Sequence, residues 1–148
     1  EFWMFHERYR PPGTVMTMMT FDTDSPSSCG IVDLDNHGVV NGFFEKVQNP
    51  PGKVANGAVY LLEPEVIRWI REHPLVTDFS TDVVPEFLGK IATWHNHGIH
   101  RDVGTLESLL DAQRDPPILQ EKFSTDDWVE MFRLHPIHTK IEQLNDQQ

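Results

Sequence analysis

Apolar residues along the chain gather in five short runs, and turn-forming residues separate each run from the next. The runs are rich in β-branched and aromatic residues, so they predict β-strands over residues 14–21, 29–34, 39–47, 56–62 and 90–96. The first and fourth runs alternate little between apolar and polar positions, which is typical of strands buried on both faces. Turn-forming residues at 35–38 join the second and third runs, and this spacing predicts a β-hairpin.

Helical periodicity is found in most of the remaining segments. It predicts helices over residues 2–10, 65–73, 83–88, 106–114 and from Asp126 onward. In the second helix, one side is formed by Val66, Ile67, Trp69 and Ile70. Asp78 or Ser80 can cap the third helix, and Thr105 can cap the fourth, with Ser108 in the place of the usual capping-box acid. Strands followed by helices indicate an α/β fold.

Length, charge and cysteine content limit the classes of partner. The 148 residues, 39% of them hydrophobic, predict one domain over residues 1–148. A formal net charge of −11 would repel the phosphates of nucleic acids and anionic membranes, so neither is an expected partner. No apolar run approaches the roughly 20 residues of a membrane span. Cys29 is the only cysteine, which is compatible with a reducing compartment, and we expect a cytoplasmic location.

Polar residues that could bind a ligand or take part in catalysis lie at the ends of predicted strands and at one helix start. Glu45 and Lys46 end an apolar strand, where side chains reach a crevice outside the sheet, although a solvated ion pair is the ordinary alternative. Asn56 and Gly57 begin the next strand; Gly lets a ligand approach the backbone, and Asn offers a donor and an acceptor. Asp102 precedes a helix, where it either favours the helix dipole or binds a divalent metal.

Four motifs occur in an order that resembles a known enzyme family. They are FFEK (43–46), ANGAVY (55–60), DFSTDVVP (78–85) and DVGT (102–105). In this order they resemble the nucleotidyltransferases that make nucleoside-diphosphate sugars from a sugar 1-phosphate and an NTP. The resemblance covers about residues 14–114 and leaves 115–148 as a C-terminal helical extension. It implies a Rossmann-like α/β fold with a mixed, mostly parallel sheet flanked by helices, present here as the incomplete, C-terminal portion.

The resemblance also implies roles for individual residues in the sugar pocket. Lys46 would bind the phosphate of the sugar 1-phosphate, and Glu45 would hydrogen-bond the sugar. Asn56 and Gly57 would line the pocket, and the backbone of Gly30 would contact the sugar. These five residues are therefore the expected substrate-binding groups of the chain.

Asp102 matches the family aspartate that helps to hold Mg²⁺, whose partner aspartate would lie in the missing N-terminal half. In such enzymes the sugar phosphate attacks the α-phosphorus of the NTP, and pyrophosphate leaves. Catalysis then consists mainly of aligning two anions and neutralising their charge. Lys46 and Asp102 are accordingly the expected catalytic residues, Mg²⁺ is the expected cofactor, and NTP and sugar 1-phosphate are the expected partners.

The chain departs from the family pattern at several positions. The glycine-rich, Arg-containing loop that cradles the triphosphate is missing, so we expect no transfer without an N-terminal half. Val47 replaces the usual proline, and His100 and Arg101 replace an aromatic and an aliphatic residue; Arg101 is a candidate additional phosphate contact. The first helix begins without a cap before Phe2, as in part of a longer protein. An uncovered strand edge would then favour self-association into a homo-oligomer.

Two alternatives stay open at this stage. The chain could be a non-catalytic regulatory module that binds a sugar phosphate or a sugar nucleotide. His95, His97 and His100 could instead form a zinc cluster, because histidines at i and i+2 of a strand share one face. The histidine run lacks a water-activating Glu at a recognised spacing, which disfavours that second alternative.

Overall fold

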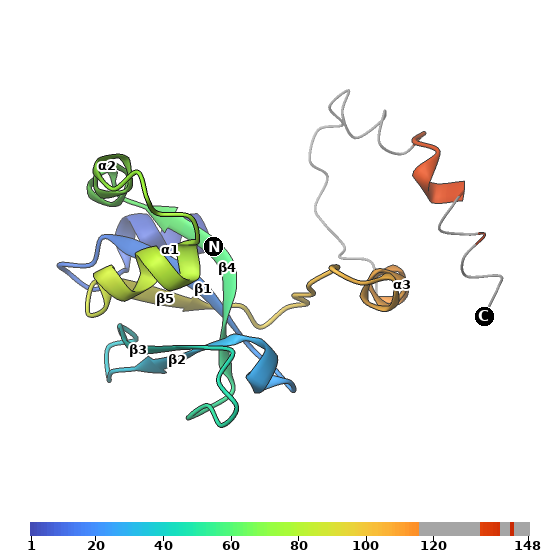
Figure 1. The fold of residues 1–148 in the computed structure, drawn as a ribbon, viewed down its shortest axis with the longest axis horizontal. Coiled ribbons are helices and arrows are strands. Elements are labelled where there is room, and N and C mark those ends of the chain that lie inside the picture. The colour runs from blue at the N-terminus through green and yellow to red at the C-terminus, as the bar shows by residue number, and fades with distance from the viewer. Residues whose placement is uncertain (116–133, 140–142, 144–148) are drawn as a thin grey trace. The chain divides into compact units, whose positions relative to one another are not determined.

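The computed structural model describes residues 1–115, 134–139 and 143, which fall into two compact units, 1–100 and 101–148 (Figure 1). The second unit contains helix α3 (Leu106–Arg114). The first unit contains, in order, α1 (Phe2–Arg8), β1 (Met16–Asp22), the short 3₁₀ helix η1 (Pro26–Ser28), β2 (Gly30–Leu34), β3 (Val40–Glu45), β4 (Val54–Leu62), α2 (Pro64–Glu72), the π-helical turn η2 (Phe79–Val83), the 3₁₀ helix η3 (Val84–Phe87) and β5 (Ile91–His95).

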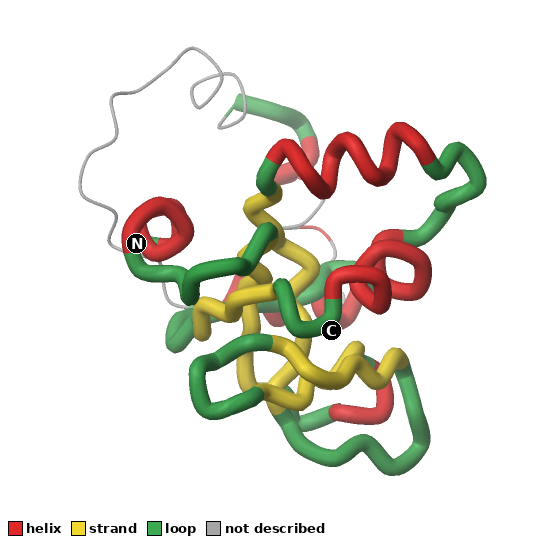
Figure 2. The backbone as a smooth tube through the Cα atoms, turned by 90° about the vertical axis from the view of Figure 1, so that its left-hand side faces the viewer, coloured by secondary structure: helices red, strands yellow, loops and turns green. Residues whose placement is uncertain are grey.

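The strands of the first unit form one mixed sheet in the order β3-β2-β4-β1-β5 (Figure 1; Figure 2). The predicted hairpin of β2 and β3 and the expected α/β, Rossmann-like architecture with flanking helices are confirmed. The expectation of a mostly parallel sheet is wrong for the described residues, because three of the four strand pairings are antiparallel and only β1 with β5 is parallel. A short turn such as 35–39 can join only antiparallel neighbours, whereas parallel ones need a long crossover.

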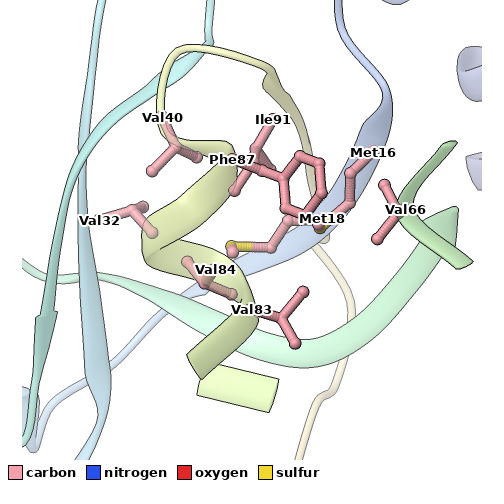
Figure 3. Close-up of a cluster of buried hydrophobic side chains, with 9 residues drawn as sticks. All are labelled: Met16, Met18, Val32, Val40, Val66, Val83, Val84, Phe87 and Ile91. Atoms are coloured by element: carbon pink, nitrogen blue, oxygen red, sulfur yellow. The ribbon is translucent and has the colours of Figure 1, made fainter. Parts of the chain in front are cut away.

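A single apolar cluster packs one face of the sheet against α2, η2 and η3. Figure 3 shows its members: Met16, Met18, Val32, Val40, Val66, Val83, Val84, Phe87 and Ile91. Met16, Met18 and Thr17 of β1 are fully buried, which confirms the prediction that this strand is covered on both faces. Ile67 does not join the cluster: it is 46% exposed, so only Val66, Trp69 and Ile70 of α2 face the core.

The segment between α2 and β5 forms two short turns in place of the predicted helix over 83–88. A π-helical turn, η2, is followed at once by the 3₁₀ helix η3. Of the two candidate caps, Asp78 caps η2 and not a helix over 83–88: its Oδ1 accepts a hydrogen bond from the Thr81 amide at 2.9 Å. Pro85 has no N–H group to donate, and this prevents a regular α-helix from running through the segment.

β4 is more exposed than its sequence predicts. The strand begins at Val54, and Ala58 and Val59 in its middle are exposed. β1 lies along the whole of one edge of β4, but β2 pairs with the other edge only at Ala55. The register also shifts near Ala58, whose φ of 55° is left-handed. Among the described residues, the outer edge of β4 beyond Ala55 therefore has no neighbouring strand.

A buried polar network fixes α1 against the sheet. The His6 side chain is 4% exposed, and its Nδ1 lies 2.7 Å from the Thr17 hydroxyl of β1. Its Nε2 lies 3.1 Å from Arg10 and 3.4 Å from Glu63, and Arg10 and Glu63 form an ion pair. Because Glu63 precedes α2, the network connects α1 with both β1 and the start of α2.

In the second unit, α3 begins as the sequence predicts. The Thr105 hydroxyl accepts from the Ser108 amide at 3.1 Å, and the Ser108 hydroxyl accepts from the Thr105 amide at 3.1 Å. Serine thus completes a reciprocal capping box in the place of an acid. The helix predicted from Asp126 onward lies mostly outside the described residues. No helix in the described part of the chain is long and apolar enough to cross a membrane.

Candidate functional site

Three of the predicted site residues lie side by side on neighbouring strands. Gly30 of β2 pairs with Glu45 of β3, and Gly30 and Asn56 each lie one residue beyond the Ile31–Ala55 pair that joins β2 to β4. The line continues through Thr20 of β1, the partner of Asn56, to its own partner on β5, His95. We call this line, Glu45–Gly30–Asn56–Thr20–His95, the polar row. Directly opposite residues point to the same face of a sheet, so these side chains share one face.

Gly30 is required by the space around Glu45. A Cβ atom added at Gly30 would lie 2.5 Å from the Phe43 ring and 2.6 Å from Glu45 Oε2. The Glu45 carboxylate and the Phe43 ring edge therefore lie directly over the Gly30 backbone. Gly30 is buried beneath these two groups, so the lack of a Cβ atom at Gly30 is what lets Glu45 and Phe43 pack closely against β2.

Lys46 follows Glu45 in a left-handed backbone conformation. Its φ is 49°, in a backbone region that residues other than glycine rarely adopt. Its amide donates to the Cys29 carbonyl at 3.1 Å. Its side chain is 68% exposed, and Nζ lies 3.6 Å from Glu45 Oε1. An exposed pair of this kind contributes little to stability. The ammonium group is thus available to an anion, and a strained backbone at such a position is typical of binding sites.

Asn56 is held by two local hydrogen bonds. Its Nδ2 donates to the Tyr60 hydroxyl at 2.6 Å, and its Oδ1 accepts from the Ala58 amide at 2.9 Å. The Tyr60 ring packs on Phe79 of η2, with centroids 4.4 Å apart, and burial raises the pKa of Tyr60 above its ordinary value. The sequence motifs did not reveal this contact, since nothing in the spacing shows that η2 lies against β4.

Gly57 faces the opposite side of β4 from Asn56. A Cβ atom at Gly57 would lie 2.7 Å from Met19 Cε, 3.1 Å from the Met19 carbonyl oxygen and 3.4 Å from His100 Nε2. The His100 ring packs on the Phe21 ring, with centroids 4.6 Å apart. His100 therefore occupies the position of a packed aromatic residue beside Gly57.

Arg101 and Asp102 belong to the second unit. The Arg101 guanidinium forms a bidentate pair with Asp115 at 2.8 and 2.7 Å, which raises the pKa of Arg101 and lowers that of Asp115. Asp102 is exposed, and its Oδ1 accepts a hydrogen bond from the Gly104 amide at 3.1 Å. Its other carboxylate oxygen makes no hydrogen bond or ion pair with the described residues and suits a hard cation.

The histidines near the end of β5 do not form a metal site. His95 Nδ1 lies 3.2 Å from the Thr20 hydroxyl, and its Nε2 lies 3.6 Å from Asp22 Oδ2. The rings of His95 and His97 touch, with centroids 4.8 Å apart, whereas His100 packs on Phe21. Within residues 1–115, 134–139 and 143, no three His, Cys, Asp or Glu side chains are placed to hold a metal ion. The zinc-cluster alternative is therefore wrong.

Comparison with known proteins identifies the family of the chain. The family described as nucleotidyl transferase matches residues 1–117. The chain belongs to the nucleotidyl transferase family. Among its relatives are a glucose-1-phosphate adenylyltransferase of Clostridium acetobutylicum, 24% identical over 119 residues, and mannose-1-phosphate guanyltransferase 2 of Candida glabrata, 29% identical over 110 residues. These alignments cover 75% and 72% of the chain, but only 31% and 29% of the relatives.

A solved structure of the same fold also matches most of this chain but a smaller share of its own. It comes from Bacillus anthracis, was assigned as a glucose-1-phosphate thymidylyltransferase, and contains sucrose. The two chains are 21% identical and superpose with a TM-score of 0.62, over 80% of this chain and 49% of the other. The likeness establishes a nucleotidyl transferase fold. This chain spans about a third of the length of the curated relatives it matches.

Proposed function

We propose that this chain supplies the sugar-phosphate side of a site that transfers an NMP group from an NTP to a sugar 1-phosphate. The products are an NDP-sugar and pyrophosphate. One observation carries the proposal: the polar row brings Glu45, Gly30 and Asn56 together on adjacent strands, with Lys46 next to Glu45. Relatives whose names specify sugar 1-phosphate substrates support the class of reaction.

In this proposal each residue of the sugar pocket has a defined task. The Glu45 carboxylate accepts hydrogen bonds from sugar hydroxyl groups, and Gly30, which has no side chain, leaves room for that carboxylate over β2. Asn56 adds a donor and an acceptor at the other side of the pocket, whereas Gly57 faces the opposite side of β4 and leaves room there for Met19 and His100. Lys46 binds the phosphate as a compact point charge and so aligns the attacking oxygen.

The phosphate chemistry requires positive charge, which Lys46 and Arg101 would provide. A phosphate oxygen of the sugar 1-phosphate attacks the α-phosphorus, and the bond to pyrophosphate breaks, with little need for proton transfer. The pair with Asp115 uses Nε and Nη2 of Arg101, so the N–H groups of Nη1 stay available to a phosphate while Asp115 remains bound.

Asp102 is the residue that would hold Mg²⁺. Mg²⁺ is usually bound through one or two carboxylates together with substrate phosphates, so a single exposed carboxylate with one free oxygen fits this cation. When bound, the metal offsets the negative charge of the triphosphate. The net charge of −11 increases the need for such a cation.

The proposal assigns NTP binding to a further polypeptide segment, the N-terminal half expected from the family. The chain contains no glycine-rich, Arg-containing loop, and it spans about a third of its relatives. The outer edge of β4 beyond Ala55 offers free backbone groups against which such a segment could add a strand. The proposed location is the cytoplasm, in keeping with the single cysteine.

A second candidate is a regulatory module that binds sugar phosphate without transferring a nucleotide. The substitutions Val47, His100 and Arg101 favour it, because they depart from the usual residues beside the phosphate and metal positions. The two candidates make the same sugar-binding prediction. They differ in turnover and in the need for a metal.

Pyrophosphate release from the full-length protein distinguishes these candidates. The assay uses Mg²⁺, a panel of NTPs and hexose or heptose 1-phosphates, and release with at least one pair is expected. Lys46→Ala should raise the KM for the sugar phosphate about tenfold or more, since a charged hydrogen bond contributes about 1.5–3 kcal/mol. Asp102→Asn should abolish metal-dependent turnover.

Lys90→Ala is the matched control, because Lys90 forms an exposed ion pair of nearly the same length with Glu65, at 3.5 Å. It should leave the kinetics unchanged. A folded full-length protein that binds sugar phosphate but releases no pyrophosphate with any pair would establish the regulatory module instead. Equal effects of Lys46→Ala and Lys90→Ala would contradict the role given to Lys46.

A further inference from the structure

The side-chain amide of Asn56 is nearly immobilised by the protein itself. One N–H of Nδ2 is used by the Tyr60 hydroxyl, and one lone pair of Oδ1 is used by the Ala58 amide. An asparagine amide has two N–H donors and two lone pairs, so one donor and one acceptor position stay open to a ligand. The orientation of these open positions depends on both local bonds.

The two local bonds differ in origin. Ala58 lies on the same strand, two residues from Asn56, and adopts a left-handed backbone with φ of 55°. Tyr60 brings in a distant part of the chain, because its ring packs on Phe79 of η2, with centroids 4.4 Å apart. The Tyr60 ring, which carries the hydroxyl that meets Asn56, is thus held from the η2 side.

The surroundings of Tyr60 keep its hydroxyl in the neutral form, which accepts the hydrogen bond from Asn56. Burial raises the pKa of the phenol, and the carboxylates of Glu45 and Asp78 add to this effect, so the hydroxyl stays neutral at physiological pH. A neutral hydroxyl can accept from Asn56 and still donate its own proton. π-helical turns such as η2 are rare and occur often at functional sites.

We infer that Tyr60 is a positioning residue, whose hydroxyl fixes the Asn56 amide in the orientation that binds the sugar phosphate, with η2 as its support. This inference rests on the proposed function. It extends that function to a tyrosine and a turn that lie behind the substrate contacts. Tyr60 itself touches Asn56 and Phe79, and acts on the ligand through Asn56.

A double-mutant cycle in the full-length protein tests the inference. Affinities for α-glucose 1-phosphate and α-mannose 1-phosphate are measured by calorimetry for wild type, Tyr60→Phe, Asn56→Ala and the double variant. Tyr60→Phe should weaken binding about five- to tenfold, the effect of one hydrogen bond. In the Asn56→Ala background the same change should weaken binding less than twofold, because the Asn56 amide that Tyr60 orients is already absent.

Tyr9→Phe is the matched control, since Tyr9 is the only other tyrosine and is 67% exposed. It should leave the affinity unchanged. Tyr60→Phe retains the ring that packs on Phe79, and near-ultraviolet circular dichroism checks that the fold is intact. An equal loss of affinity from Tyr60→Phe with and without Asn56 would overturn the inference.

A second measurement is independent of sugar binding. In ¹⁵N-labelled 148-residue chain, the two Asn56 side-chain amide protons are followed by NMR. In wild type the proton bonded to Tyr60 should exchange with solvent more slowly than its partner, and Tyr60→Phe should remove the difference. Unchanged Asn56 signals in Tyr60→Phe would overturn the inference even if sugar phosphates bind. Altered Asn56 signals in a protein that binds neither sugar phosphate would uphold the positioning contact and count against the proposed function alone.

Discussion

Lys46 combines a proposed binding role with an unfavourable backbone conformation. Its left-handed conformation, with φ of 49°, costs a non-glycine residue about 1–2 kcal/mol. Lys46→Gly should therefore raise the free energy of unfolding by about 0.5–1 kcal/mol, after the entropy cost of glycine, and should weaken sugar phosphate binding at least tenfold. Urea unfolding and calorimetry measure the two effects. A variant that loses both stability and binding would argue against strain at this position.

Gly30 makes a second prediction at the residue scale. In Gly30→Ala the new methyl group would lie 2.6 Å from Glu45 Oε2 and 2.5 Å from the Phe43 ring, so the flexible Glu45 carboxylate must move. We expect a fivefold or greater rise in the sugar phosphate KM, with about 1 kcal/mol or less lost in stability. Gly52→Ala is the control, because nothing lies within 4 Å of its Cβ position. Similar kinetics for the two variants would contradict the proposed role of Gly30.

The sequence motifs predicted which residues gather at the site, but not how they are supported. Glu45, Gly30 and Asn56 become neighbours because hairpin pairing and strand register are local consequences of turn chemistry and apolar patterning. The Tyr60–Phe79 contact joins β4 to the η2 turn, and no local pattern encodes that approach. Side-chain contacts between distant segments depend on packing, which a single sequence does not display.

At the scale of elements, α1 is fixed by the buried His6 network. Burial, and next the charge of Arg10, lower the pKa of His6 below its ordinary value of 6.5, while Glu63 and Glu7 oppose the shift. The unfolded state therefore binds a proton more readily than the folded state, and stability falls as the pH drops below about 6.5. One histidine can contribute up to about 1.4 kcal/mol per pH unit in this window.

Urea unfolding between pH 7.5 and 5.5 checks this prediction. The loss of stability on acidification should be smaller in His6→Asn than in wild type. His37→Asn, which changes an exposed histidine of the hairpin turn, should retain the wild-type loss. If His6→Asn and wild type lose stability in parallel, another group is responsible for the pH dependence.

The sequence patterns predicted some helices and strands better than others. Five strands, three helices and the capping box of α3 follow from alternation, periodicity and caps. The helix predicted over 83–88 became the η2 and η3 turns because Pro85 interrupts the backbone hydrogen bonds. The apolar residues of β4 alone predict a buried strand. Its burial also depends on which strands lie beside it, and these neighbours are set by the topology of the sheet.

At the scale of the whole molecule, the outer edge of β4 predicts association. Residues beyond Ala55 present unpaired backbone groups among the described residues, and Val59 is 43% exposed there. We expect the isolated chain to self-associate or to retain a partner polypeptide. Val59→Lys should shift the chain toward monomer in light-scattering chromatography, because a charge on an open strand edge opposes strand pairing.

Leu75→Lys is the control for this experiment, since Leu75 is 91% exposed in a loop and not on a strand edge. It adds the same charge and removes a more exposed apolar side chain, yet should leave association unchanged. A wild-type chain that is monomeric at all concentrations, with no bound polypeptide, would refute the prediction. Equal dispersal by both variants would point to general hydrophobic association.

The β2–β3 hairpin is joined to the other strands at few places. Ile31 pairs with Ala55, the Gly38 carbonyl accepts from the Thr93 amide and hydroxyl, and the Gly89 amide donates to Val40. The bonds at Gly38 and Val40 anchor the hairpin at its turn, and Gly30, Glu45 and Lys46 lie at its open end. We therefore expect that a relative's hairpin of equal length would carry its sugar preference with it, provided that it keeps these anchors and the core residues Val32 and Val40.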